Sequence, residues 1–225
     1  IMSKPILEIV HKQFPKISKP FPAIPQLSLL VEFTTTSELD LNIDDTGETI
    51  FQKKIINVMS HLIENHLIED AVISQSDHQN KELWEIRENA NIAQMQEGFQ
   101  LKLDLSIPIE NMSKFWIETS EELKKKHTEV KICSFGHLGD GNLHYNLMDE
   151  DKNKEYVYNN QTALKELVYK KIKKFNGSFS AEHGIGQLKI EELEKYKDQN
   201  LFNLMRTIKN SVDPKNILNP GKLFN

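Results

Sequence analysis

Two histidines flank a glycine-rich turn in the second half of this 225-residue chain. They are His137 and His144, in the stretch SFGHLGDGNLHYN at residues 134–146. Strand-like runs lie on both sides of the Gly-Asp-Gly turn at 139–141, and this pattern predicts a β-hairpin. Because a hairpin brings its two ends together, we expect the two imidazoles to face each other across the ladder. They could then share one metal ion, at about 2.0–2.1 Å from each nitrogen.

A third ligand for this ion has to come from another part of the chain. The best candidate is Glu182, in the glycine-rich stretch SAEHGIG at residues 180–186, where His183 would stand beside the metal without binding it. Two imidazoles and one carboxylate with open positions are typical of a catalytic metal site. Such ligands suit Zn²⁺, Mn²⁺ or Co²⁺, and we expect Zn²⁺ first. Side chains alternate along a strand, so Asn146 should share a face with His144 and could hold a substrate oxygen.

Strands and helices must position these residues, and their alternation predicts an α+β fold. Apolar or alternating runs predict strands at residues 27–33, 71–73, 101–107, 130–135 and 143–147. Helical periodicity predicts helices at 50–63, with Asp45 or Thr46 as the cap, and at 81–96, 109–126, 155–175, 190–197 and 201–211. Several connections are short hairpins, so we expect a mostly antiparallel sheet covered by helices rather than a doubly wound parallel sheet.

The composition argues against several functional classes. A formal net charge of −5 and a pI of about 5.9 do not suit a nucleic-acid-binding protein, which needs a concentrated basic face. No run of about 18 apolar residues predicts a membrane span, and the first residues lack the apolar region of a signal peptide. The single cysteine, Cys133, excludes a disulfide framework and lies in an apolar run that predicts a buried thiol.

Three stretches of the chain together resemble the C-terminal domain of the FAD-linked oxidase family. This family includes D-lactate dehydrogenases, D-2-hydroxyglutarate dehydrogenases and the flavin subunit of glycolate oxidase. The stretches are GHLGDGNLH at 136–144, SAEHGIG at 180–186 and DPKNILNPGK at 213–222, and their order and spacing also match. The resemblance extends more weakly from about Phe21 to the C-terminus.

The resemblance implies a role for each residue of the two histidine-containing motifs. In the family, the positions of His137, His144 and Glu182 bind a divalent metal. The following histidine, His183 here, lies at the reacting carbon and is the usual candidate for the general base. The position of Asn146 binds the substrate carboxylate.

The resemblance also implies two cationic contacts to acidic groups of the substrate. They are Arg87, in the stretch WEIRE, and Lys102 in the next predicted strand. Members specific for hydroxyglutarate carry a threonine four residues after the arginine, where this chain has Asn91. Asparagine can also form hydrogen bonds with a substrate, but the departure puts a five-carbon diacid in doubt. D-lactate, glycolate and other D-2-hydroxyacids stay open.

The activity implied by the resemblance is oxidation of a D-2-hydroxyacid to a 2-oxo acid, with hydride transfer to FAD and an electron acceptor that the sequence does not identify. Nothing here matches the family's glycine-rich flavin loop, so we expect the FAD-binding domain elsewhere in a parent protein. Residues 1–20 would be a connecting segment and 21–211 the substrate- and metal-binding cap domain. Residues 212–225 would form a tail that carries Asn219 back to the flavin.

Two other functions stay open at this point. A stand-alone metal-dependent hydrolase would use the same ligands to activate water, but no acid–base carboxylate is evident beside the metal motif. A non-catalytic binding module would need no metal. For the location we expect the cytoplasm, or the mitochondrial matrix if a preceding part of the parent protein carries a transit peptide.

Overall fold

The computed structural model describes residues 1–45 and 47–224. An antiparallel sheet lies at its centre, with strand order β2-β1-β5-β6-β3, and β4 also pairs with β6. The strands are β1 (Met2–Ser3), β2 (Leu27–Ser28), β3 (Gln100–Leu101), β4 (Asp104–Ser106), β5 (Val130–Phe135) and β6 (Asn142–Asp149). The α-helices are α1 (Lys4–Gln13), α2 (Ile50–Glu64), α3 (Asp77–Glu88), α4 (Ala90–Met95), α5 (Ile109–Lys126), α6 (Tyr156–Asn159), α7 (Gln161–Lys174), α8 (Ile190–Tyr196) and α9 (Gln199–Val212).

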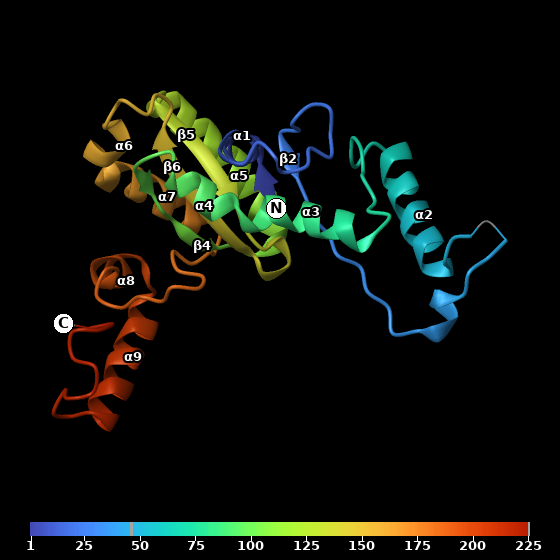
Figure 1. Ribbon diagram of the computed structural model, residues 1–225. Coiled ribbons are helices and arrows are strands. Elements are labelled where there is room, and N and C mark those ends of the chain that lie inside the picture. The colour runs from blue at the N-terminus through green and yellow to red at the C-terminus, as the bar shows by residue number, and fades with distance from the viewer. Residues whose placement is uncertain (46, 225) are drawn as a thin grey trace.

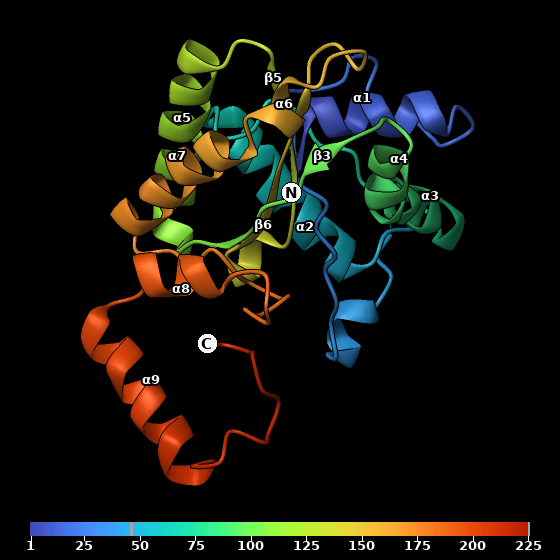
Figure 2. The ribbon, with the colours of Figure 1, turned by 90° about the vertical axis from the view of Figure 1, so that its left-hand side faces the viewer.

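Helices cover both faces of the sheet, as Figure 2 shows with α5 and α7 on one side and α1, α3 and α4 on the other. Each face has its own apolar core. The first core includes Phe115, Tyr145 and Leu164, and the second includes Ile6 and Ala93. Each fully buried large apolar side chain stabilises the fold by about 1.5–3 kcal/mol. This arrangement confirms the predicted α+β class with an antiparallel sheet.

Strands β5 and β6 form the predicted hairpin and run through the middle of the sheet. Tyr145 and Leu147 point into the first core. Because side chains alternate along a strand, His144 and Asn146 face the other side, toward α3 and α4. The hairpin therefore presents its polar residues on one face of a strand whose other face is fully buried.

Helix α5 agrees with the sequence prediction at both ends. It follows Pro108, and its buried residues Met112, Phe115, Thr119 and Leu123 recur every three or four positions. The spacing gives one apolar stripe, which packs on the first core. Three lysines occupy its last turn, where the helix dipole favours positive charge.

Two predicted strands are wrong in whole or in part. The strand at 27–33 ends after Ser28, and Leu29, Val31 and Phe33 are exposed. Residues 71–73 are not in a strand at all. Residues 29–33 and 71–73 have strand-like sequences, but a strand needs a partner, and in the described part of the chain neither stretch pairs with another strand.

Three other predicted elements are split. The helix predicted at 155–175 becomes α6 and α7, which are separated at Asn160. The helix predicted at 81–96 becomes α3 and α4, which are separated at Asn89. The strand predicted at 101–107 becomes β3 and β4, because the N–H of Leu103 donates to the side-chain Oδ1 of Asn146 instead of to a strand backbone. The cap of α2 is Thr49, which forms a capping box with Gln52. It is not Asp45, and Thr46 lies outside the described residues.

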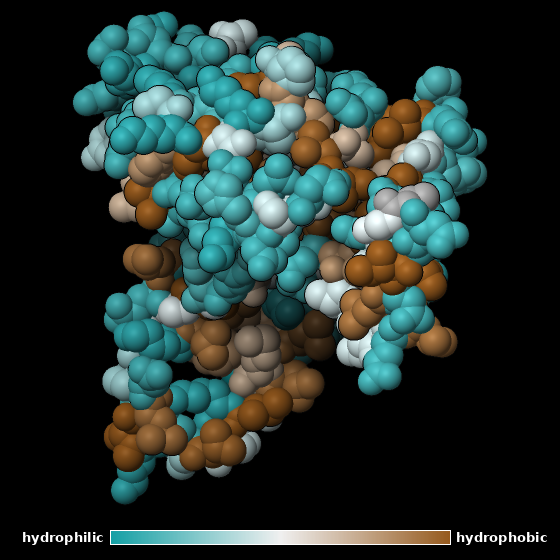
Figure 3. All heavy atoms as spheres, turned by 45° about the vertical axis from the view of Figure 1, so that its right-hand side comes forward, coloured by the Kyte–Doolittle hydropathy of each residue, from teal (hydrophilic) through white to brown (hydrophobic). Residues whose placement is uncertain are grey.

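The remaining segments extend away from the sheet, as Figure 1 shows for α2 and for the lobe of α8 and α9. Brown apolar side chains appear on the surface of these projections in Figure 3. The exposed apolar residues of these segments include Leu39, Leu41, Ile43, Val58, Leu201, Leu204, Ile208 and Val212. Among the described helices, none combines the length and the apolar character that crossing a membrane requires.

Residues 1–20 supply β1 and α1. Strand β1 pairs with both β2 and β5, and α1 contributes Ile6, Leu7 and Val10 to the second core. This segment is therefore part of the folded body that contains the sheet. The limits of the domains themselves stay a prediction.

Candidate metal and substrate site

The loop between β5 and β6 is a tight turn that depends on glycine. The N–H of Asn142 donates to the carbonyl of His137 at 3.1 Å and closes the loop. Gly141 has a φ of +67°, and a Cβ there would collide with the carbonyl oxygen of Ile107. Only glycine combines this backbone conformation with so close an approach. The loop thus fixes where His137 leaves β5 and where β6 begins.

The two histidines do not face each other in the ladder as predicted. Phe135, not His137, is the register partner of His144. The carboxylate of Glu182 instead lies between the two rings, with Oε1 at 3.9 Å from His137 Nδ1 and Oε2 at 3.8 Å from His144 Nε2. The side-chain amide of Asn142 also donates to Glu182. The three predicted ligands are therefore brought together, but around the carboxylate.

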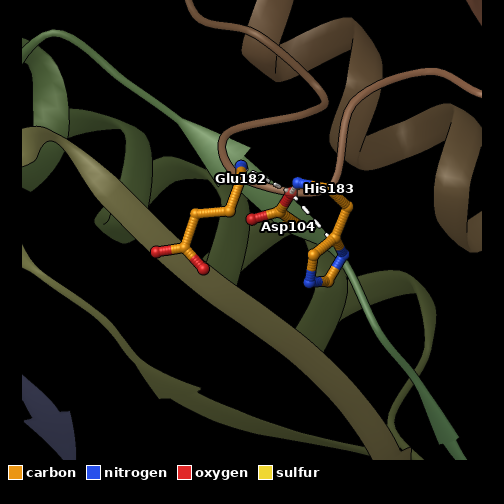
Figure 4. A group of neighbouring side chains, drawn as sticks. All are labelled: Asp104, Glu182 and His183. Carbon is orange, nitrogen blue, oxygen red and sulfur yellow. Dashed lines mark hydrogen bonds and ion pairs between the residues drawn. The ribbon is translucent and has the colours of Figure 1, made fainter.

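A buried aspartate holds the turn that carries Glu182. Asp104 Oδ2 accepts the backbone N–H groups of Ala181, Glu182 and His183 at 3.1, 3.0 and 3.0 Å. Figure 4 shows the Asp104 carboxylate beneath the turn, with the side chains of Glu182 and His183 on either side of it. An isolated bridge between Ser106 and the segment preceding the turn brings that segment alongside β4.

Burial and hydrogen bonding oppose each other at Asp104. Burial is the largest single effect and acts to raise the pKa of its carboxyl. The N–H groups of His183 and Glu182, together with the positive charge of Lys189 and the nearby His183 ring, outweigh it, so the pKa lies below its ordinary value. At His144, burial lowers the pKa of the imidazole, against the attraction of the Glu182 and Asp104 charges. His144 is therefore neutral at pH 7, the form in which imidazole binds a metal.

Arg87 lies next to the site and stacks on an aromatic ring that separates it from His144. Its guanidinium carbon lies 5.0 Å from the centroid of Phe135, and the Phe135 ring lies 5.0 Å from that of His144. Burial lowers the pKa of Arg87, while the charge of Glu182 acts to raise it. A guanidinium in this position stays charged and presents a planar fork to an anion.

Lys102 and Asn91 lie together, with Lys102 Nζ 3.5 Å from Asn91 Oδ1. Both side chains are exposed. Asn146 is different, because it is buried and both ends of its amide have protein partners. Its Oδ1 accepts from Leu103, and its Nδ2 donates to Gln94 Oε1 at 2.8 Å. These bonds fix the orientation of the Asn146 amide and leave its second N–H as the group that a substrate could meet.

The C-terminal tail folds back toward the glycine-rich loop. The N–H of Leu223 donates to the carbonyl of Gly186 at 3.1 Å, and the Phe224 ring packs on that of Phe202. Asn219, the expected flavin contact, is exposed and has a φ of +52°. The tail therefore lies close to the loop that carries Glu182, and Asn219 is open to solvent.

The donor atoms in this region fit a divalent cation. Asp104, Glu182 and His183 each offer a ligand atom, and these atoms lie within 4.8 Å of one another. His137 and His144 approach the same glutamate from its other side. A set of imidazoles and carboxylates with one half-exposed side suits Zn²⁺, Mn²⁺ or Co²⁺.

Sequence reasoning missed three residues of this region: Asp104, Phe135 and Gln94. Alternation in the run at 101–107 puts Asp104 on the polar side with Lys102, and nothing in the sequence reports that this side is covered at Asp104. Phenylalanine is common in strands and glutamine is common in helices, so the residue types of Phe135 and Gln94 do not indicate a role in the site. For Asp104 the one available signal is a carboxylate at a polar position of an alternating strand.

Comparisons with known proteins give a family match along almost the whole chain. A family model described as FAD linked oxidases, C-terminal domain, matches residues 6–223. D-2-hydroxyglutarate dehydrogenase of Stutzerimonas stutzeri is 31% identical over 76% of the chain, which covers 37% of that protein. The enzyme of the same name from Xanthomonas citri pv. viticola is 37% identical over 72% of the chain and 34% of its own length.

A plant relative is similar in the same way. The mitochondrial D-2-hydroxyglutarate dehydrogenase of Arabidopsis thaliana is 34% identical over 81% of the chain and 32% of its own length. The chain thus spans about a third of the length of the curated relatives that it matches.

Proposed function

The chain belongs to the FAD linked oxidase C-terminal domain family, and from this membership we propose that it is the substrate- and metal-binding part of a flavin-dependent dehydrogenase. The parent protein oxidises a D-2-hydroxyacid to a 2-oxo acid. The observation that carries the proposal is the position of Glu182 between His137 and His144, at 3.9 and 3.8 Å.

His137, His144 and Glu182 would hold the metal, with Zn²⁺ favoured over Mn²⁺ and Co²⁺. When bound, the ion would polarise the substrate hydroxyl and lower its pKa. His144 is held between the Phe135 ring and Glu182, so one ligand nitrogen is already oriented. His137 is exposed and completes the site from the solvent side.

His183 would act as the general base. Its Nδ1 lies 3.7 Å from Asp104 Oδ2, which leaves Nε2 available to take the hydroxyl proton. Its ring is exposed and 6.3 Å from the ring of His144, so a substrate held at the metal side would lie within reach of it. The Asp104 carboxylate behind the imidazole would orient the ring.

Arg87, Lys102, Asn91 and Asn146 would bind the acidic groups of the substrate. Arg87 offers two parallel N–H donors to one carboxylate, and Lys102 with Asn91 offers a second polar position. The named relatives act on D-2-hydroxyglutarate, whereas Asn91 replaces the threonine of hydroxyglutarate-specific members. Whether D-2-hydroxyglutarate or a smaller acid such as D-lactate is preferred is decided by the binding measurement below.

FAD, bound by a further domain of the parent protein, would accept the hydride from the substrate carbon. That domain is the proposed partner of this chain, and Asn219 in the exposed tail is the proposed contact with the cofactor. The exposed apolar side chains of α9, Leu201, Leu204, Ile208 and Val212, support a further domain that covers this helix.

The metal content of the 225-residue chain tests the proposal. The protein is purified without chelator, supplied with Zn²⁺, Mn²⁺ and Co²⁺ in turn, and measured by plasma mass spectrometry. We expect about one tightly held ion per chain, and its loss in His144→Ala. His78→Ala, which removes an exposed imidazole of α3, is the matched control and should keep the metal.

The metal-loaded chain is then titrated with D-2-hydroxyglutarate, D-lactate and their L-enantiomers by calorimetry. Binding that prefers a D-acid supports the proposed substrate class. Hydrolysis of esters or phosphates by the loaded chain would favour a metal-dependent hydrolase instead. Retention of metal by His144→Ala, together with no binding of any hydroxyacid, would favour a non-catalytic module.

For the location of the parent protein, we propose the cytoplasm, with the mitochondrial matrix as the alternative. The name of the plant relative supports the alternative and the names of the two bacterial relatives do not mention it. Fractionation of source cells with an antibody against the chain distinguishes the two.

A further inference from the structure

The two oxygens of Asp104 have very different surroundings. The side chain is 3% exposed, and Oδ2 accepts three backbone N–H groups. Oδ1 is also buried, and within the described residues it has no hydrogen-bond partner. A buried carboxylate oxygen without a donor costs free energy, so its position points to a group that it is built to meet.

An imidazole, that of His144, lies close to that oxygen. Asp104 and His144 are register partners of β4 and β6, and they lie directly opposite each other in the sheet. Oδ1 is 3.9 Å from His144 Nδ1, while His144 Nε2 is directed at Glu182. Closing the first gap by about 1 Å would make an ordinary hydrogen bond.

We propose that Asp104 is the positioning residue of the site. Through Oδ1 it accepts the Nδ1–H of His144, which leaves the lone pair on Nε2 directed at Glu182. Through Oδ2 it fixes the turn that carries Glu182 and His183. The proposal builds on the proposed function, since it assigns the residue that orients both segments of the metal site.

The reason lies in the two tautomers of neutral imidazole. Only one ring nitrogen carries the proton, and only the other can bind a metal. A carboxylate behind a ligating histidine fixes which nitrogen is which, and losing such a partner commonly weakens metal binding about 10- to 100-fold. Here one carboxylate would orient two segments of the site. Its Oδ1 would orient His144, and its Oδ2 accepts the N–H groups of the turn that carries Glu182 and His183.

Asp104→Asn separates these functions. The three N–H groups of the turn need an acceptor, so the amide oxygen would take the place of Oδ2 and the NH₂ group would face His144. An NH₂ donor at Nδ1 forces the proton onto Nε2, the nitrogen directed at Glu182. The variant keeps its shape and its turn but holds His144 in the wrong tautomer.

The first measurement is a long-range proton–nitrogen correlation NMR spectrum of the metal-free, ¹⁵N-labelled chain at neutral pH, with His144 assigned through His144→Gln. We expect the Nδ1–H tautomer in the unsubstituted chain and the Nε2–H tautomer in Asp104→Asn. An Nε2–H tautomer in the unsubstituted chain overturns the proposal, and so does a tautomer that does not change in the variant.

The second measurement is Zn²⁺ affinity by chelator competition. We expect Asp104→Asn to bind about 10- to 100-fold more weakly than the unsubstituted chain. Asp149→Asn is the matched control, because Asp149 is also a buried strand aspartate that accepts a backbone N–H, from Val157, far from the site. Equal affinity of Asp104→Asn and Asp149→Asn overturns the proposal.

The two measurements separate this inference from the proposed function. If the unsubstituted chain binds no metal, the proposed metal site is wrong. In that case the Nδ1–H tautomer and its reversal in Asp104→Asn still support Asp104 as the residue that orients His144. If metal binds and His144 has the Nε2–H tautomer, the metal centre stands and the role of Asp104 is overturned.

Discussion

At the scale of single residues, the site is a set of charged groups whose surroundings decide their chemistry. Asp104 is ionised despite its burial because three N–H groups compensate for the loss of water. His144 is neutral because its burial outweighs two nearby carboxylates. Arg87 gains orientation from the face of Phe135. The same residue types on an open surface would have none of these properties.

The role of the Arg87 guanidinium in substrate binding can be tested by a charge-conserving substitution. We expect Arg87→Lys to weaken binding of a D-2-hydroxyacid to the metal-loaded chain about 10-fold, because an ammonium cannot make two parallel hydrogen bonds to a carboxylate. Calorimetric titration measures the change. Arg206→Lys is the matched control, since Arg206 also stacks on a phenylalanine, Phe202, away from the site. Equal effects of the two substitutions would remove Arg87 from the binding site.

The role of His183 as the base can be tested in the proposed parent protein, which would include the FAD-binding domain. We expect His183→Gln to leave the metal content unchanged and to lower kcat by about 10²- to 10⁴-fold, because glutamine cannot take a proton. Reduction of an artificial acceptor dye measures turnover, and plasma mass spectrometry measures the metal. Turnover within twofold of the unsubstituted enzyme would show that another group is the base.

At the scale of elements, the β5–β6 hairpin does most of the positioning. Its register places His144 opposite both Phe135 on β5 and Asp104 on β4. Its loop directs His137 toward Glu182 from outside the ladder. A shift of one residue in β6 would turn His144 and Asn146 into the apolar core, so the buried face of the strand keeps the register fixed.

The loop of this hairpin gives a matched pair of glycine substitutions. We expect Gly141→Ala to lower the free energy of unfolding by about 2–4 kcal/mol, because the backbone has a positive φ and the new Cβ meets the Ile107 carbonyl. Gly139→Ala should change it by less than about 0.5 kcal/mol, since among the described residues nothing lies within 4 Å of a Cβ there. Urea denaturation measures both, and similar costs would contradict the described loop.

At the scale of the whole molecule, two apolar cores on opposite faces of one sheet support the site. The second core includes Ile86 on α3, Ala90 on α4, and Cys133 and Phe135 on β5. The segments that carry Arg87, Asp104, His144 and Glu182 are far apart in the sequence and meet around β6. Loss of that core would therefore separate the site residues as well as unfold the chain.

Cys133 reports on the integrity of this core. Burial raises the pKa of its thiol to about 12, so at pH 8 almost no thiolate is present in the folded chain. We expect Ellman's reagent to label Cys133 at least about 100-fold more slowly in the folded chain than in urea. Rapid labelling under native conditions would contradict the buried position.

The same shift predicts how stability depends on alkaline pH. The folded-state pKa lies above the unfolded value of 9.0, so the contribution of the neutral thiol is complete below pH 9 and is lost as the pH rises toward 12. We expect the free energy of unfolding to fall less steeply between pH 9 and 11 in Cys133→Ala than in the unsubstituted chain. Parallel pH profiles of the two proteins would show that Cys133 does not contribute.

Local patterns in the sequence were enough to determine part of this protein. The Gly-Asp-Gly turn between two apolar runs specified the β5–β6 hairpin, and the periodicity at 109–126 specified α5, because turn chemistry and helical repeats depend on neighbouring residues. The motifs around His137, His144 and Glu182 identified the residues that come together. They also carried the resemblance to the family that the comparisons then established.

Only the tertiary structure decided how those residues meet. The sequence placed His137 opposite His144, whereas the register puts Phe135 there and Glu182 between the two rings. It also gave no role to Asp104, whose burial depends on a turn almost 80 residues away in the chain. Pairing and burial of this kind depend on contacts between remote segments, and a local pattern contains no information about which remote segment will cover a given face.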